Sequence, residues 1–135
     1  MNFYVNQIAA DRWSGVLTDD DVIVSPTLDD LHRVIGALDA NIRTSVFLKG
    51  DNGAYLAIGG GTGKYIVYAS PSDQQFWNLI ANRPDENGIV SLAVGGQDGD
   101  YPARQVVDKN IAIMAAESFF LKGERDPSLH WELQR

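Results

Sequence analysis

Residues 44–69, TSVFLKGDNGAYLAIGGGTGKYIVYA, decide the fold of this chain. Three apolar segments alternate there with turn-forming residues, a pattern typical of consecutive β-strands. The three segments are residues 44–49, 54–58 and 64–69. Between the first two, Asn52 and Gly53 form a strong hairpin signal because both tolerate positive φ. The stretch therefore predicts an antiparallel meander of three strands.

The glycine-rich run between the second and third strands, residues 59–63, is followed by Lys64 and invites comparison with phosphate-binding loops. A P-loop requires glycine at position 58 and Ser or Thr at position 65, where the sequence has Ile58 and Tyr65. Both flanks are predicted strands, so no helix N-terminus would receive a phosphate. The run is interpreted as a flexible hairpin turn.

Two helices are predicted outside this meander. The first begins at residue 26 or 27 and ends at 39, with Thr27 and Asp30 placed to form a capping box. The second spans residues 108–122, with Asp108 as its cap and Gly123 as its stop. Its expected apolar face consists of Ile111, Met114, Ala115, Ser118 and Phe119.

Further strands are predicted on both sides of these helices. They are residues 12–17, ending at an acidic loop over residues 18–21, residues 89–94, and residues 129–133. The Asp98-Gly99-Asp100 stretch is expected to be a polar turn. Residues 73–82 fit either a helix or a strand, so that assignment stays open. The elements predict an α+β fold, a mainly antiparallel sheet with two helices packed on one face.

The length and composition suit one soluble domain over residues 1–135. The chain is 44% hydrophobic and 21% charged, and no apolar run approaches the roughly 20 residues that a membrane helix needs. Its first residues lack the basic start and apolar segment of a secretory signal. A cytoplasmic protein without membrane contact is therefore expected.

The charge balance bears on the choice of partner. Eighteen acidic and eleven basic side chains give a net charge of -7. This field repels phosphate backbones, so nucleic acid is not expected as a partner, whereas a basic protein would be attracted. Many proteins are acidic for solubility alone, and that explanation of the charge stays open.

The sequence shows no recognisable catalytic or metal-binding motif. With no cysteine and two histidines it offers neither a thiol nucleophile nor a multi-histidine metal site. His130 and Glu132 match the first half of the zinc deaminase motif, but the second half requires two cysteines. The chain is expected to be no enzyme and to hold no cofactor or metal.

The C-terminal third carries an ordered set of short motifs. They are Gly95-Gly96, Pro102, Phe119-Phe120-Leu121-Lys122-Gly123, Pro127, Leu129 and Trp131-Glu132. This order resembles the first-numbered immunity-protein family of bacterial polymorphic toxin systems, and the upstream helix and strands resemble the same family. The resemblance implies a small α+β inhibitor that binds a cognate toxin in the producer's cytoplasm and blocks its active site. Toxins of this kind are often nucleic-acid deaminases. The signature residues Phe119, Gly123, Pro127 and Trp131 would hold the fold together.

Toxin-contacting residues are expected on acidic and aromatic loops and exposed strand positions, because acidic side chains can compete for a toxin's basic substrate surface. The candidates are Asp19, Asp20, Asp21, Asp51, Asn52, Trp77, Asp98, Asp100 and Tyr101. Two alternatives stay open. One is a small α+β adaptor that binds a ligand or peptide between helix and sheet. The other is an enzyme with a carboxylate-based site.

Overall fold

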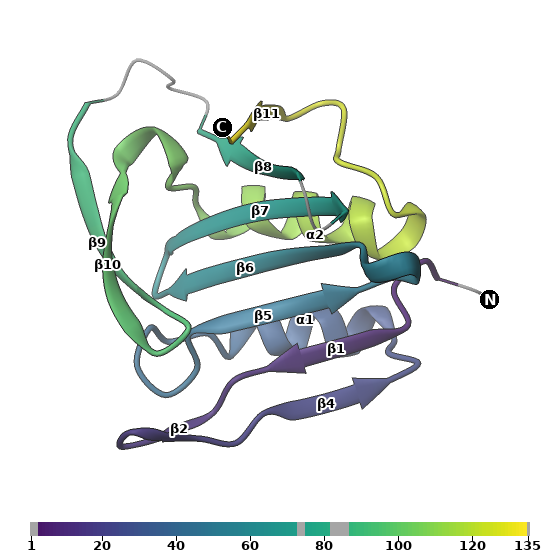
Figure 1. Cartoon of the computed structure of the whole chain (residues 1–135), viewed down its shortest axis with the longest axis horizontal. Coiled ribbons are helices and arrows are strands. Elements are labelled where there is room, and N and C mark those ends of the chain that lie inside the picture. The colour runs from purple at the N-terminus through teal and green to yellow at the C-terminus, as the bar shows by residue number, and fades with distance from the viewer. Residues whose placement is uncertain (1–2, 73–74, 82–86, 135) are drawn as a thin grey trace.

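The computed structural model describes residues 3–72, 75–81 and 87–134. Among these residues the largest element is a seven-stranded sheet in the order β11-β8-β7-β6-β5-β1-β4, with antiparallel neighbours (Figure 1). Its strands are β1 (Gln7–Ala10), β4 (Asp21–Val24), β5 (Ser45–Lys49), β6 (Tyr55–Gly61), β7 (Lys64–Ser72), β8 (Gln75–Ile80) and β11 (His130–Leu133). Strands β5, β6 and β7 pair in succession, which confirms the predicted meander.

Two ribbons stand apart from this sheet. One joins β2 (Trp13–Ser14) to β3 (Leu17–Thr18), and the other joins β9 (Ile89–Val94) to β10 (Gln97–Pro102). Short 3-10 turns are η1 (Asp51–Gly53) and η2 (Ala103–Gln105). Both ribbons lie at one end of the sheet, and η1 lies at the other (Figure 1).

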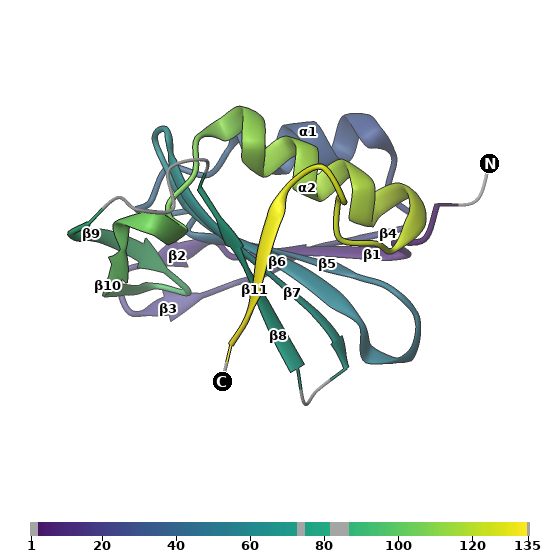
Figure 2. The same cartoon turned by 90° about the horizontal axis from the view of Figure 1, so that it is seen from above.

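The helices α1 (Leu28–Gly36) and α2 (Lys109–Lys122) cover the same face of the sheet (Figure 2). The predicted α+β fold, with two helices on one face of a mainly antiparallel sheet, is confirmed. The core lies between the two layers, where Ile8, Leu48 and Phe120 have no exposed surface. No helix in the described part of the chain is long and apolar enough to cross a membrane.

The start of α1 follows the predicted capping box. The Thr27 hydroxyl accepts a hydrogen bond from the Asp30 N–H at 3.1 Å, and the Asp30 carboxylate accepts one from the Thr27 N–H at 2.9 Å. The helix ends at Gly36, three residues before the predicted end. The Leu38 N–H donates to the carbonyl of Ile35, so the chain tightens and leaves the helix while Leu38 still reaches the core.

The ends of α2 are as predicted, but its buried face is not. Asp108 accepts a hydrogen bond from the Ile111 N–H at 2.9 Å, and Gly123 ends the helix with a φ of 71°. Met114, predicted to be buried, is 40% exposed. The buried side chains are Ala112, Ala115, Ala116, Phe119 and Phe120. This helix is apolar on most of its circumference, so periodicity could not select the face, and three alanines let it approach the sheet closely.

The prediction for the N-terminal region was wrong in its strand positions. The sheet strand there is β1, because Ile8 and Ala10 enter the core, whereas residues 12–17 form only the small ribbon β2–β3. Asp21, assigned to a loop, begins β4. The apolar run of that strand, Val22-Ile23-Val24, is short and does not alternate with polar residues, and only Ile23 packs against the core.

Three further assignments are settled by the structure. Gly59 and the two glycines after it belong to β6, so the turn is restricted to Thr62 and Gly63. A Cβ at Gly59 would lie 2.5 Å from Val94, so glycine lets the β9–β10 ribbon approach β6. The predicted turn at residues 98–100 is instead part of β10. Within the open 73–82 segment, residues 75–80 form β8, while 73, 74 and 82 lie outside the described residues.

Candidate binding surface

The acidic residues 19–21 occupy two different environments. Asp19 and Asp20 are exposed between β3 and β4, where Asp19 forms an ion pair with Arg12 at 3.1 Å. Asp21 forms a 2.6 Å ion pair with Arg43. The hydrogen bond from Arg43 is the main reason why the pKa of Asp21 lies below its ordinary value. Asp21 therefore ties β4 to the segment before β5 although its side chain is 46% exposed, whereas Asp19 and Asp20 are the more exposed pair.

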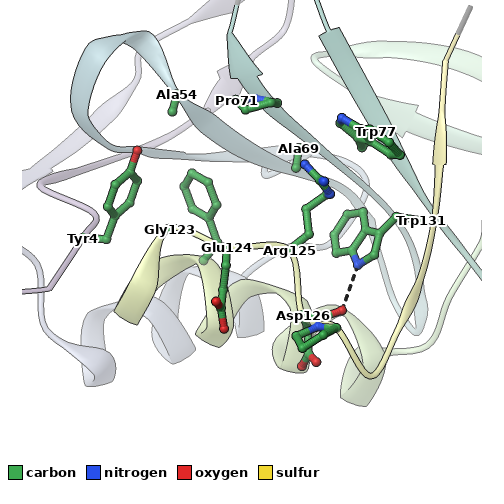
Figure 3. Close-up of a pocket in the computed structure, with 12 residues that line it drawn as sticks. Tyr4, Ala54, Ala69, Pro71, Trp77, Gly123, Glu124, Arg125, Asp126 and Trp131 are labelled. Atoms are coloured by element: carbon green, nitrogen blue, oxygen red, sulfur yellow. Dashed lines mark hydrogen bonds between the residues drawn. The ribbon is translucent and has the colours of Figure 1, made fainter.

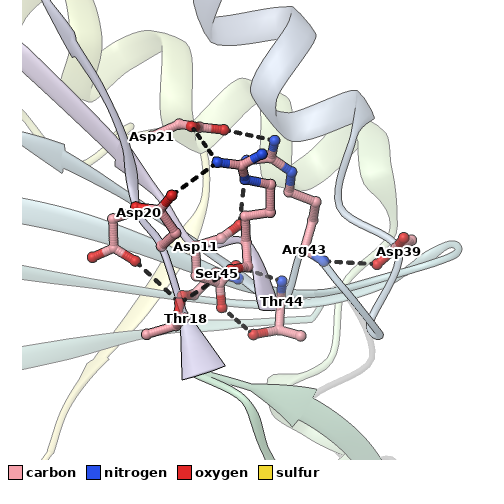
Figure 4. A network of polar contacts seen from close by, with 10 residues as sticks. Asp11, Thr18, Asp20, Asp21, Asp39, Arg43, Thr44 and Ser45 are labelled. Atoms are coloured by element: carbon pink, nitrogen blue, oxygen red, sulfur yellow. Dashed lines mark hydrogen bonds and ion pairs between the residues drawn. The ribbon is translucent and has the colours of Figure 1, made fainter. Parts of the chain in front are cut away.

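Behind this acidic segment lies a buried carboxylate that the sequence did not reveal, that of Asp11 (Figure 4). It accepts hydrogen bonds from the backbone N–H groups of Thr44 and Ser45 at 2.7 and 3.0 Å and from the Trp13 indole at 2.8 Å. The Thr44 hydroxyl also donates to it. Burial would raise the pKa of Asp11, but these hydrogen bonds outweigh it and hold the pKa below its ordinary value.

The Asp11 network joins the two ribbons. Thr44 Oγ1 accepts a hydrogen bond from the Gly96 N–H at 2.9 Å, at the tip of the β9–β10 ribbon. A Cβ at Gly96 would lie 2.1 Å from the ring of Trp13, so this glycine permits the close contact between the ribbons. The network therefore holds both ribbons, with their exposed carboxylates, against one end of the sheet.

Asp98, Asp100 and Tyr101 lie on the β9–β10 ribbon, on opposite sides of it. Gly99 pairs with the buried Leu92, so Gly99 and Tyr101 face the main sheet while Asp98 and Asp100 point outward. Tyr101 lines a cavity of about 400 Å³ against the main sheet, and burial raises its pKa. The exposed carboxylates of Asp98 and Asp100 thus lie at the same end of the molecule as those of Asp19 and Asp20.

The other predicted loop, Asp51 and Asn52 in η1, lies at the opposite end of the sheet (Figure 1). Asn52 has a φ of 57°, the conformation expected from the hairpin signal. Asp51 accepts a hydrogen bond from the Asn6 side chain at 3.3 Å. The structure thus places the two ribbons at one end of the sheet and η1 at the other, although Asp20 and Gly53 of η1 line one cavity of about 490 Å³.

Trp77, predicted as a possible exposed anchor, is half-buried on the helix side of β8. The guanidinium of Arg125 lies 4.1 Å from the centre of its ring, a cation–π distance. Its Nε1 is buried and has no hydrogen-bond partner among the described residues. Trp77 is therefore covered by the segment that follows α2.

This segment forms one wall of a cleft of about 550 Å³ at the C-terminal end of α2 (Figure 3). Trp77 and Trp131 line one side and Tyr4 the other, and the Arg125 side chain extends between them. Phe119 also lines the cleft, with its ring centre 5.4 Å from that of Tyr4. Trp131 donates from its indole N–H to the carbonyl of Asp126 at 3.1 Å. Of the signature residues, Phe119 and Trp131 pack beside this cleft and Gly123 caps α2, so they have structural roles in this region.

The sheet face opposite the helices, here called the open face, carries aromatic residues that sequence analysis did not single out. Four rings from adjacent strands β5 to β8 follow one another across it. Successive ring centres are 5.7, 6.2 and 6.2 Å apart. These residues, here called the aromatic stripe, are Phe47, Tyr55, Tyr68 and Phe76, and all are partly exposed.

Strand alternation carried a signal for part of this stripe. Phe47 lies between the buried Val46 and Leu48, and Tyr55 precedes the buried Leu56. An aromatic residue at the non-core position of a predicted strand points to the opposite face. The sequence did not specify which face the helices would cover, so these rings could not be identified as exposed.

The described residues contain no cluster of three or more His, Asp or Glu side chains that could hold a metal ion. The buried Asp11 carboxylate is fully engaged by backbone and side-chain donors that position the chain. Asp11 therefore has a structural role.

Comparison with known proteins gives one family. The model of the family described as immunity protein Imm1 matches residues 6–133. The match begins just before β1 and ends with β11, so it includes the whole sheet and both helices. No curated protein matches the chain.

Proposed function

Because this chain belongs to the Imm1 family of immunity proteins, we propose that it protects its producer by binding a cognate toxin domain and neutralising it. The observation that carries the proposal is the family match, which includes every strand of the main sheet and both helices. The protein acts by forming a complex and performs no chemistry of its own.

The proposed toxin is a basic, nucleic-acid-acting domain of the deaminase type, and inhibition consists of covering its active site or substrate channel in the producer's cytoplasm. Two observations support this proposal. The sequence resembles the immunity proteins found beside such toxins, and the net charge of -7 attracts a basic substrate-binding surface. The inhibitor would then compete with the phosphate backbone for the same cations.

The proposed toxin contacts include the exposed carboxylates of the two ribbons, Asp19, Asp20, Asp98 and Asp100, together with Tyr101. The Asp11 network supports this choice because it holds both ribbons in a defined position before binding. Trp77 would contribute only after Arg125 moved away. Asp21 would act by placing β4, since it is paired with Arg43.

Co-expression with the toxin encoded beside this gene tests the function. Growth of cells producing both proteins, together with a stable one-to-one complex after purification, is the expected result. A variant of the core, Leu48→Asp, is the control for folding, since Leu48 has no exposed surface. Cell death despite soluble, folded immunity protein, with no complex formed, would refute the proposal.

The cleft beside α2 favours a second candidate, a ligand- or peptide-binding adaptor. Its volume of about 550 Å³ and its aromatic walls suit an apolar or planar group. A thermal-shift screen with aromatic amino acids and short peptides tests this candidate. A rise in Tm that Trp131→Ala abolishes would favour the adaptor, and no rise with any compound would refute it.

A further inference from the structure

We propose that the aromatic stripe on the open face is the centre of the toxin-binding interface and receives an apolar, arginine-bearing segment of the toxin. This proposal rests on the proposed function and adds to it the surface and the chemistry of the partner. The centre of the interface would then lie in the middle of the sheet, whereas the sequence predicts toxin contacts on the acidic loops.

The pairing of the strands extends the apolar surface beyond the four rings. Tyr68 pairs with Ala57, which pairs with Phe47. Phe47 pairs with Ala9, and Ala9 pairs with Val22. Directly paired residues point to the same side of a sheet, so this row lies on the open face. From β4 to β7 it crosses five strands, or about 19 Å at the usual strand spacing.

The open face remains apolar where it is exposed. Val22 and Val24 are 54% and 72% exposed, and the ring of Tyr68 lies between those of Tyr55 and Phe76. Exposed apolar side chains that gather on one face of a sheet mark interaction sites more often than scattered single ones do. Tyrosine and phenylalanine are also enriched in the centres of protein interfaces.

One carboxylate and one ammonium group border this apolar centre. Asp20 lines a cavity of about 490 Å³ on the open face together with Phe47 and Tyr55. Lys49, a basic residue, lines the same cavity. Aromatic rings beside the Asp20 carboxylate suit arginine, whose planar guanidinium stacks on rings and pairs with carboxylates.

Charge decides between the toxin and a second copy of this chain as the occupant. Two copies meeting through their open faces would bring together two molecules that each carry a net charge of -7. A basic partner is instead attracted by that net charge. The β9–β10 ribbon, whose Val94 packs against Gly59, covers one end of the face and would limit the approach of a second large sheet.

Binding of purified variants to the purified toxin domain encoded beside this gene tests the proposal by calorimetry. Tyr68→Arg should weaken the complex by about 30-fold or more, as for a central interface residue, while Tyr68→Phe keeps the ring and should bind within about threefold of wild type. Val22→Arg is a second disrupting variant, because Val22 is more than half exposed and the fold does not depend on it. Met114→Arg is the matched control, an arginine at a 40% exposed site on the helix layer.

The outcomes separate this inference from the proposed function. Loss of binding in Tyr68→Arg and Val22→Arg, with Tm unchanged and Met114→Arg normal, supports the open face. If wild type binds and both open-face variants bind equally well, the inference is overturned while the immunity function stands. If Tyr68→Arg unfolds, Val22→Arg alone decides by the same criterion.

Two further outcomes are possible. A wild-type protein that neither binds the toxin nor protects the cell overturns both the proposed function and this inference. Self-association that Tyr68→Arg abolishes without loss of toxin binding assigns the open face to a second copy of this chain.

Discussion

At the scale of single residues, Asp11 contributes most to the arrangement of the ribbons. Its carboxylate is buried and accepts hydrogen bonds from two backbone N–H groups, a hydroxyl and an indole. A buried carboxylate without such donors would be strongly destabilising. Since the donors are Trp13, two residues away, and residues 44 and 45, two segments far apart in the chain must come together before all of these hydrogen bonds form.

Replacement of Asp11 by Asn should lower the free energy of unfolding by about 3 kcal/mol at neutral pH, because the amide nitrogen would face donors instead of accepting from them. The pKa of Asp11 is depressed in the folded protein, so its contribution is present above the unfolded value near 4 and is lost as pH falls through the lower folded pKa. Wild type and variant should therefore converge in stability below about pH 4. Urea denaturation from pH 3 to 7 measures this.

Asp100→Asn is the control for the Asp11 experiment, since the same change is made on the exposed side of β10. It should leave the unfolding midpoint unchanged at neutral pH. Equal effects of the two substitutions would contradict the role assigned to Asp11.

At the scale of elements, the ends of the helices follow local rules while their contacts do not. Thr27 and Asp30 form a reciprocal capping box that involves only neighbouring residues. Gly123 has the left-handed conformation common at helix ends, but it also lies against the ring of Tyr4 from the N-terminal segment. The capping box depends on the spacing of Thr27 and Asp30 in the sequence. The contact between Gly123 and Tyr4 depends on how the chain packs.

Removal of the capping box gives a prediction at this scale. Thr27→Ala should cost about 1 kcal/mol of unfolding free energy, because the N–H of Asp30 loses its acceptor. Thr27→Ser retains the hydroxyl and should cost less than half as much. Chemical denaturation measures both values, and equal losses in the two variants would argue against a capping role.

The end of α2 gives a second prediction. Gly123→Ala should cost at least about 2 kcal/mol, because the new Cβ must adopt a positive φ and would lie 2.6 Å from the Tyr4 ring. Gly95→Ala is the matched control, with a similar φ of 62° and nothing within 4 Å of the new Cβ, and should cost about 1 kcal/mol. The difference between the two, measured by urea denaturation, isolates the contact with Tyr4. No difference would mean that Tyr4 moves aside freely.

At the scale of the whole molecule, charge and shape act together. The net charge of -7 gives a long-range field, and the two ribbons place part of that charge at one end of the sheet. Long-range fields change association rates more than dissociation rates. The aromatic stripe, in contrast, acts only at contact distance.

Replacing Asp19 and Asp20 by lysine tests whether charge near the ribbons sets the association rate. Asp19→Lys with Asp20→Lys should slow association with the toxin about tenfold at low ionic strength and weaken its salt dependence. Asp21 is left unchanged because it is paired with Arg43. Stopped-flow measurements at several salt concentrations give the rates.

The matched control carries the same charge change elsewhere, as Asp29→Lys with Glu124→Lys, two exposed residues away from the ribbons. If the control slows association as much as the ribbon variant, the total charge matters and the position does not. Unchanged rates in the ribbon variant would remove Asp19 and Asp20 from the interface.

The sequence alone was sufficient for the fold class, the central meander, both helix starts and the C-terminal strand, because each follows from spacing and turn chemistry within a few residues. It also contained the resemblance that the family match bears out. It could not place β1 and β4, whose signals are short and whose strand character comes from pairing with each other and with β5.

Only the tertiary structure decided which surfaces are available. Periodicity marks an alternation of faces but does not say which face a helix covers, so Met114 was expected inside and the aromatic stripe was not recognised outside. The partners of Asp11, the pairing of Asp21 with Arg43 and the cover of Arg125 over Trp77 all join residues far apart in the chain. Contacts of this kind depend on packing, and packing is set by the whole fold.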